Sequence, residues 1–77
     1  MRESVTYQAI LEEGREEGER LGRMRELHRV ILRLGRVRFG EVDESIRQQI
    51  EGIRNIDRLE DLTERLVMVS SWDELMA

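Results

Sequence analysis

Apolar side chains recur with helical spacing over residues 24–38, MRELHRVILRLGRVR. The stripe consists of Leu27, Val30, Ile31, Leu34 and Val37. This i, i+3, i+4, i+7 spacing is typical of a helix with one apolar face. Leu21, Met24 and Leu32 widen the apolar arc beyond the roughly 100° that a helix facing one neighbour needs. We therefore expect a helix that is covered on two sides, by the rest of its own chain and by a second subunit.

Two shorter apolar stripes follow this helix. Gly40 is placed to end it, because glycine readily takes the left-handed conformation that closes a helix, and Phe39 is then expected to fold back onto the core. Asp43 is a suitable N-cap for the next helix. The apolar faces of the two short helices are predicted at Ile46, Ile50 and Ile53, and at Leu59, Leu62, Leu66 and Val69.

Capping-box spacing marks the start of the second short helix and of a final turn. Asp57 with Glu60 has this spacing, and Ile56 precedes it as a hydrophobic staple. Ser71 with Glu74 is a full capping box. The final turn carries the single tryptophan, which is expected to anchor the core and whose indole N–H needs a partner there. Three methionines are also expected to fill the core: Met24, Met68 and Met76.

These patterns predict an all-α chain in two parts. The chain has no proline, and no alternation of period two is long enough for a strand. We expect a helical connector over residues 1–23 and a small helical domain over residues 24–77. In this domain a long helix meets two short antiparallel helices and a terminal turn. The expected assembly is a homo-oligomeric helical bundle.

The connector has a helical pattern but weak helix-forming chemistry, as its segment EEGREEGERLGR shows. Gly14, Gly18 and Gly22 each cost about 1 kcal/mol relative to alanine. The pairs Glu16–Arg20 and Glu19–Arg23 have favourable i, i+4 spacing, but each such pair contributes only roughly 0.2–0.5 kcal/mol. The segment should therefore fray unless another helix covers it.

A heptad arrangement offers one such contact, as an imperfect coiled coil between subunits. The heptad places two adjacent rows of side chains along one face of the predicted helix. The side chains of both rows are small or apolar, apart from His28 and Glu17. The predicted oligomer interface consists of Tyr7, Ile10, Gly14, Leu21, Met24, His28 and Ile31. The alternative is a flexible helical connector without a fixed contact.

Composition favours self-association. A chain of 77 residues is one small domain at most, and such domains are marginally stable alone. The chain has no cysteine and a single histidine, so neither a disulfide nor an ordinary zinc site is expected to staple it, and no cofactor is expected. Association with a partner subunit is then the remaining way to stabilise so small a domain.

Charge is divided into acidic, basic and acidic stretches. Two arginines stand against six glutamates over residues 1–19, seven arginines against one glutamate over residues 20–38, and four arginines against ten acids over residues 41–77. One interpretation is self-complementarity, within the chain or between neighbours. The other is a nucleic-acid contact through the basic helix, although no aromatic side chain stands among its arginines to stack a base. The four residues of this possible contact are Arg25, Arg29, Arg33 and Arg36.

No motif in the sequence indicates catalysis, and we expect that the chain is not an enzyme. There is no phosphate-binding loop or dinucleotide fingerprint, and the acidic pairs are neighbours on predicted helix surfaces. His28 is expected to be a structural interface residue rather than an acid or base. Residues 1–20 lack the apolar stretch of a signal peptide, and no apolar run is long enough for a membrane span. A cytoplasmic protein is expected.

The segments ILRLGRVRFGEVDESIRQQIEGI and LEDLTERLVMVSSWDEL resemble a bacterial domain of unknown function, number 4351. The resemblance covers residues 24–76 and depends on the RFG turn, the isoleucine-rich helix and the closing SSWDEL. The preceding ESVTYQAILEEGREEGE resembles the connector that links this domain to a nuclease domain of the Rpn, transposase-like PD-(D/E)xK type. The resemblance implies an appended C-terminal module without catalytic residues, since the nuclease motif needs a lysine and this chain has none.

Three functions are compatible with these observations. The first is a helical module that brings together copies of an upstream nuclease-like domain. The second is a nucleic-acid-binding accessory that uses the basic helix. The third is a docking site for another protein, with Trp72 and the basic face as anchors.

Overall fold

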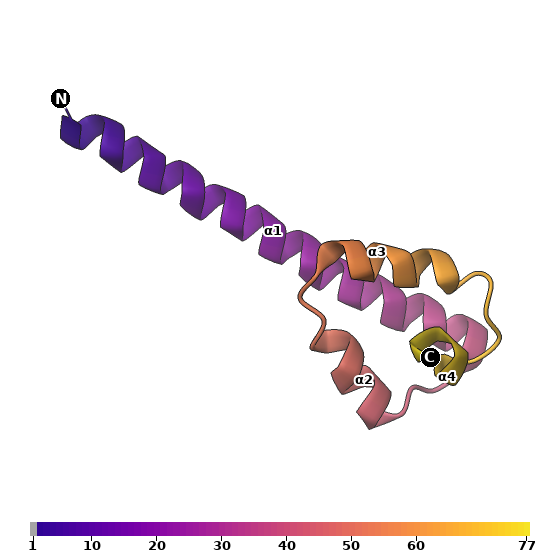
Figure 1. The fold of residues 1–77 in the computed structure, drawn as a ribbon. Helices are drawn as coiled ribbons and strands as arrows, with labels where there is room; N and C mark the ends of the chain where they lie inside the picture. Colours follow the sequence, from indigo (N-terminus) through magenta and orange to yellow (C-terminus); the bar gives the residue numbers. More distant parts are fainter. Residues whose placement is uncertain (1) are drawn as a thin grey trace.

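The computed structural model describes the backbone of residues 2–77 and the side chains of residues 11–77. Over residues 2–77 it contains four helices and no strand, which confirms the all-α prediction (Figure 1). The helices are α1 (Arg2–Phe39), α2 (Glu44–Glu51), α3 (Ile56–Arg65) and α4 (Trp72–Met76).

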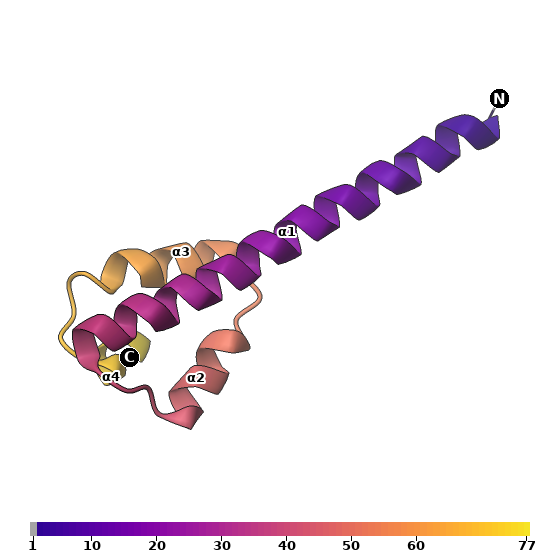
Figure 2. The ribbon, with the colours of Figure 1, turned by 180° about the vertical axis from the view of Figure 1, so that it is seen from behind.

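The first helix is unbroken for 38 residues, and its N-terminal half stands clear of the other helices (Figures 1 and 2). The chain measures 58 × 22 × 19 Å, so α1 sets its longest dimension. Residues 11–20 are all exposed and are called the arm below, and burial begins at Leu21. Residues 21–77 are called the body. The boundary predicted after residue 23 therefore falls inside a continuous helix.

The body is built on the second half of α1. Both α2 and α3 pack against this half, and α4 packs against α3 (Figures 1 and 2). Arg23 forms an ion pair with Glu60 in the middle of α3, while the Arg38 guanidinium donates to the Val69 carbonyl beyond the end of α3, at 2.8 Å. The partner of Arg23 comes before the partner of Arg38 along the chain, so α1 and α3 run in the same direction.

The core confirms the apolar stripes predicted for α2 and α3. Within these stripes, the side chains of Ile50, Leu59 and Leu62 have no exposed surface. The complete buried set is Met24, Ile31, Leu32, Ile50, Leu59, Leu62, Leu66, Trp72 and Leu75. Three helices and the final turn thus contribute to one contiguous core.

The buried face of α1 is rotated away from the predicted one. Leu34 and Val37 were expected on the buried face, but their side chains are 42% and 80% exposed. Gly35 is buried in their place, because the Trp72 indole lies directly against its backbone. Met68, expected to fill the core, is also exposed.

Capping residues define the helix ends, with one correction to the sequence prediction. Gly40 has a φ of 92° and closes α1, as predicted. Asp43 occupies the N-cap of α2, but its side chain makes no capping hydrogen bond. The N-cap of α3 is Asn55, whose Oδ1 accepts from the Asp57 N–H at 2.9 Å. The prediction of a capping box beginning at Asp57 is wrong, because the helix already begins one residue earlier.

The final turn is held by its cap and by its tryptophan. The Ser71 hydroxyl accepts from the Glu74 N–H at 3.1 Å, and the Glu74 carboxylate accepts from the Ser70 N–H, also at 3.1 Å. The Trp72 indole N–H donates to the Gly40 carbonyl at 3.1 Å, which supplies the partner that its burial requires. Its ring meets Phe39 edge-on, with centroids 5.3 Å apart. Trp72 is therefore the core anchor that the sequence predicts.

Candidate functional site

The predicted oligomer interface is largely occupied by the chain itself. Met24 and Ile31 are 4% and 0% exposed, inside the core of the body, and Leu21 is half-buried against that core. These side chains are not available to a second subunit, because α2 and α3 already cover this face of α1. Gly14 lies in the exposed arm. The side chains of the remaining two predicted apolar residues, Tyr7 and Ile10, lie outside the described residues.

His28 joins α1 to the end of α2 rather than to a second subunit. Its Nε2 lies 2.7 Å from the Ile53 carbonyl oxygen, and the side chain is half-buried. Because a carbonyl oxygen can only accept, Nε2 must donate its proton here. The geometry gives His28 a structural role within one chain.

The arm carries ion pairs that differ from those predicted. The Arg20 guanidinium holds the Glu17 carboxylate through two contacts, at 2.7 and 3.2 Å, in place of the predicted pair with Glu16. This hydrogen bonding lowers the pKa of Glu17 and raises the pKa of Arg20. Arg15 lies 4.0 Å from Glu19. All these groups face solvent, where such pairs contribute little stability.

The glycines at positions 14, 18 and 22 of α1 have open space around them. A Cβ atom added at Gly14, Gly18 or Gly22 would meet no atom within 4 Å outside the local helix backbone. No described part of the chain therefore approaches these positions. The arm gains no tertiary support that would offset the low helix propensity of its glycines.

The four arginines of the predicted nucleic-acid contact are exposed along one side of α1. Arg29 lies 3.7 Å from Glu26, an exposed pair one helical turn apart. A groove between α1 and α2 is lined by Arg25, Arg29 and Arg36, with Glu51 of α2 beside them. This row of arginines, named here the arginine row, consists of Arg25, Arg29, Arg33 and Arg36. It forms a basic surface on the body.

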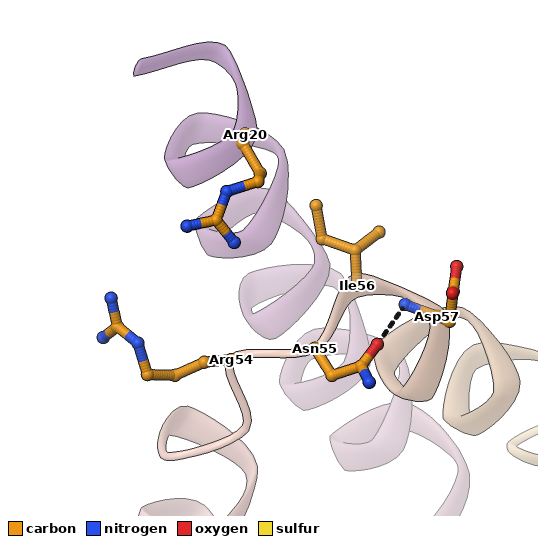
Figure 3. Close-up of a pocket in the computed structure, with 5 residues that line it drawn as sticks. All are labelled: Arg20, Arg54, Asn55, Ile56 and Asp57. Carbon is orange, nitrogen blue, oxygen red and sulfur yellow. Dashed lines mark hydrogen bonds between the residues drawn. The ribbon is translucent and has the colours of Figure 1, made fainter. Parts of the chain in front are cut away.

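A second hollow lies where the arm leaves the body (Figure 3). Arg20 of α1 and Arg54 of the loop before α3 extend along it, and Asn55, Ile56 and Asp57 form its other wall. The Asn55 side chain is already used in capping, and Arg20 is paired with Glu17. The hollow therefore offers two guanidinium groups and the Asp57 carboxylate.

Apolar side chains are also exposed at the far end of the body. Val37 and Met68 are each 80% exposed, and Val67 is 68% exposed. Trp72, by contrast, is only 7% exposed and is bonded to Gly40. The expectation that Trp72 anchors a docking protein is therefore wrong, because the core of its own chain holds this side chain.

The part of the chain that the structure describes contains neither a metal-ligand cluster nor a membrane-spanning helix. No cluster of three or more histidine, cysteine or acidic residues is found there, and no helix combines the length and apolar character needed to cross a bilayer. No family model matches the chain, and no curated protein or solved structure is similar enough to count as a relative.

Proposed function

We propose that this chain is a non-catalytic helical module that joins protein chains, beginning with copies of itself. The observation that carries the proposal is the arm of α1, which is helical and yet exposed at every position. A helix that is polar on all sides and packs on nothing is not expected to be stable by itself in water. Contact with another helix would supply the missing support.

The energies of the arm favour such a contact. Gly14 and Gly18, inside the arm, each lower helix stability by about 1 kcal/mol relative to alanine. The exposed pairs Glu17–Arg20 and Arg15–Glu19 return roughly 0.2–0.5 kcal/mol each. Local interactions therefore do not balance the cost, and a partner helix lying on the open glycine positions would.

The resemblance described above supports a place for the module in a longer protein. Residues 24–76 resemble a domain that follows an Rpn-type nuclease domain, and the arm corresponds to the connector between the two. Self-association of the module would then bring two or more nuclease-like domains together. The chain itself would supply no catalytic residue.

Measurement of mass in solution tests the proposal. We expect the 77-residue chain, of 9.2 kDa, to sediment at micromolar concentration as a dimer or larger assembly. Its melting temperature should rise with protein concentration, because association stabilises the folded state by mass action. A single species of 9.2 kDa whose melting temperature is the same at every concentration would contradict the proposal.

The arginine row favours a second candidate function, binding of a nucleic-acid backbone. Four exposed guanidinium groups on one helix face are suited to phosphate contacts. Affinity for duplex DNA should then fall with salt, with a logarithmic slope near −0.9 for each phosphate contact. Fluorescence anisotropy on the chain and on an Arg29→Gln/Arg33→Gln variant measures this slope. Equal binding by both proteins, or no binding at low salt, would exclude this function for the arginine row.

A further inference from the structure

One exposed face of α1 continues from the arm into the body. Its members recur at intervals of three, four and four residues, which is an 11-residue repeat and keeps them on one side of a nearly straight helix. They are Leu11, Gly14, Gly18, Gly22, Arg25, Arg29, Arg33 and Arg36, and all are exposed. The first half of this face, from Leu11 to Gly22, is small or apolar and is called its arm half, and the second half is the arginine row.

The two halves of α1 carry opposite charges that one chain cannot bring together. The arm carries five glutamates against two arginines, whereas the arginine row has few acids beside it, chiefly Glu26 and Glu51. Because α1 is one unbroken helix, the arm cannot fold back onto the arginine row of its own chain. A second copy of the chain can place its acidic arm against the arginine row of the first.

We propose that a second copy of this chain lies antiparallel along this face of α1, with a two-fold axis near residues 23 and 24. The spacing of the eight positions is the same read in either direction, so each small or apolar residue of one copy meets an arginine of the other. The facing pairs are Leu11 with Arg36, Gly14 with Arg33, Gly18 with Arg29, and Gly22 with Arg25. This inference rests on the proposed self-association and specifies its surface, direction and register.

Charge selects the antiparallel direction. In a parallel pair the arginine row of one copy would lie against the arginine row of the other, and the acidic arms would also meet. In the antiparallel pair each row lies along the partner's acidic arm, which replaces repulsion with attraction. The resulting contacts would be exposed, so salt should weaken them.

Shape favours the same arrangement. The open space at Gly14, Gly18 and Gly22 leaves room for the long stems of arginine, whose charged ends can then reach glutamates of the partner's arm. The body packs on a neighbouring side of α1, at Met24, Ile31 and Gly35, and α2 borders the arginine row, but the four arginines remain exposed. In such a dimer the two bodies would lie at opposite ends of the paired helices.

Cysteine cross-linking tests the register, and the chain has no cysteine to interfere. We expect an equimolar mixture of Leu11→Cys and Arg36→Cys chains to form a mixed disulfide readily, because the two positions face each other. Neither variant alone should form a disulfide efficiently, since its two copies of the same residue would be about 37 Å apart along the helices. Intact mass distinguishes the mixed product from the two symmetric ones.

A mixture of Glu13→Cys and Leu34→Cys chains is the matched control. These positions have the same register but lie on the opposite side of α1, so this mixture should cross-link at least tenfold more slowly. Rapid cross-linking of either single variant alone would overturn the antiparallel register in favour of a parallel one. An assembly in sedimentation without the mixed disulfide would overturn this surface while leaving the proposed function intact. A monomer in sedimentation would overturn both.

Discussion

Replacement of Ile31 by glutamate is expected to unfold the body, whereas the same replacement at Val37 leaves it folded. Ile31 has no exposed surface, so its loss removes roughly 1.5–3 kcal/mol of apolar burial. The new carboxylate would also be buried without a partner, at a further penalty of several kcal/mol. A chain of 77 residues has a total stability of roughly 4–12 kcal/mol, so the combined loss is sufficient to unfold it.

Val37 provides the matched control for this experiment. It lies on the same helix and on the face predicted from the sequence, but its side chain is 80% exposed. The Val37→Glu chain should therefore melt within about 0.5 kcal/mol of the original chain, as surface changes usually do. Thermal unfolding followed by circular dichroism measures the stability of both variants against the original chain. Comparable losses from the two changes would show that the buried face of α1 is wrongly placed.

Replacement of Trp72 by alanine is expected to reduce the free energy of unfolding by about 3–5 kcal/mol. The indole fills the space between Gly35 and Phe39, and its N–H is bonded to the Gly40 carbonyl. The change leaves a cavity beside Gly35 and Phe39 and removes that hydrogen bond. Urea denaturation followed by circular dichroism measures the loss, and Met68→Ala, at an exposed position, is the control.

A double-mutant cycle with Gly35 separates this contact from other effects. A Cβ at Gly35 would lie 2.0 Å from the Trp72 Cη2, so Gly35→Ala should destabilise the chain by about 1–3 kcal/mol although alanine is the better helix former. In a Trp72→Leu chain the obstructing ring atoms are gone, and the same change should be neutral or stabilising. An equal cost in both backgrounds would contradict direct packing of the indole on Gly35.

Local patterns predicted most of the body correctly. The apolar spacing of Ile50, Leu59 and Leu62 identifies their buried faces because each short helix has one narrow stripe and packs on one side. The left-handed Gly40 and the Ser71 cap also follow from local chemistry. These features depend on residues within one or two turns, which a sequence displays directly.

The face of α1 was mispredicted because the decisive contact is distant in sequence. Its apolar arc is wide enough to permit more than one buried face, and the spacing gives no reason to prefer a face that contains a glycine. Gly35 is buried only because Trp72, 37 positions later, needs the room that a missing side chain provides. A tryptophan near the C-terminal end and a glycine in the middle of a helix are separately visible in the sequence, but their pairing is not.

Met24 and Ile31 were wrongly placed at the predicted interface for a related reason. A heptad template places Met24 and Ile31 at a seam between subunits, yet the same side chains are the natural filling for the core of one chain. Gly14, the predicted interface residue in the exposed arm, stays a prediction. The arginine row was visible from its spacing, but only the continuity of α1 shows that the acidic arm cannot reach it within one copy.

The continuity of α1 has a geometric consequence for any protein part joined to its N-terminal end. Each added residue rotates such a helix by about 100° and lengthens it by about 1.5 Å. One inserted residue would turn the attached part by more than a quarter of a circle, while seven would restore nearly the original direction about 10 Å farther away. The number of residues in the arm would therefore fix the direction and distance of an attached part relative to the body, even at positions where the identity of the side chain has little effect.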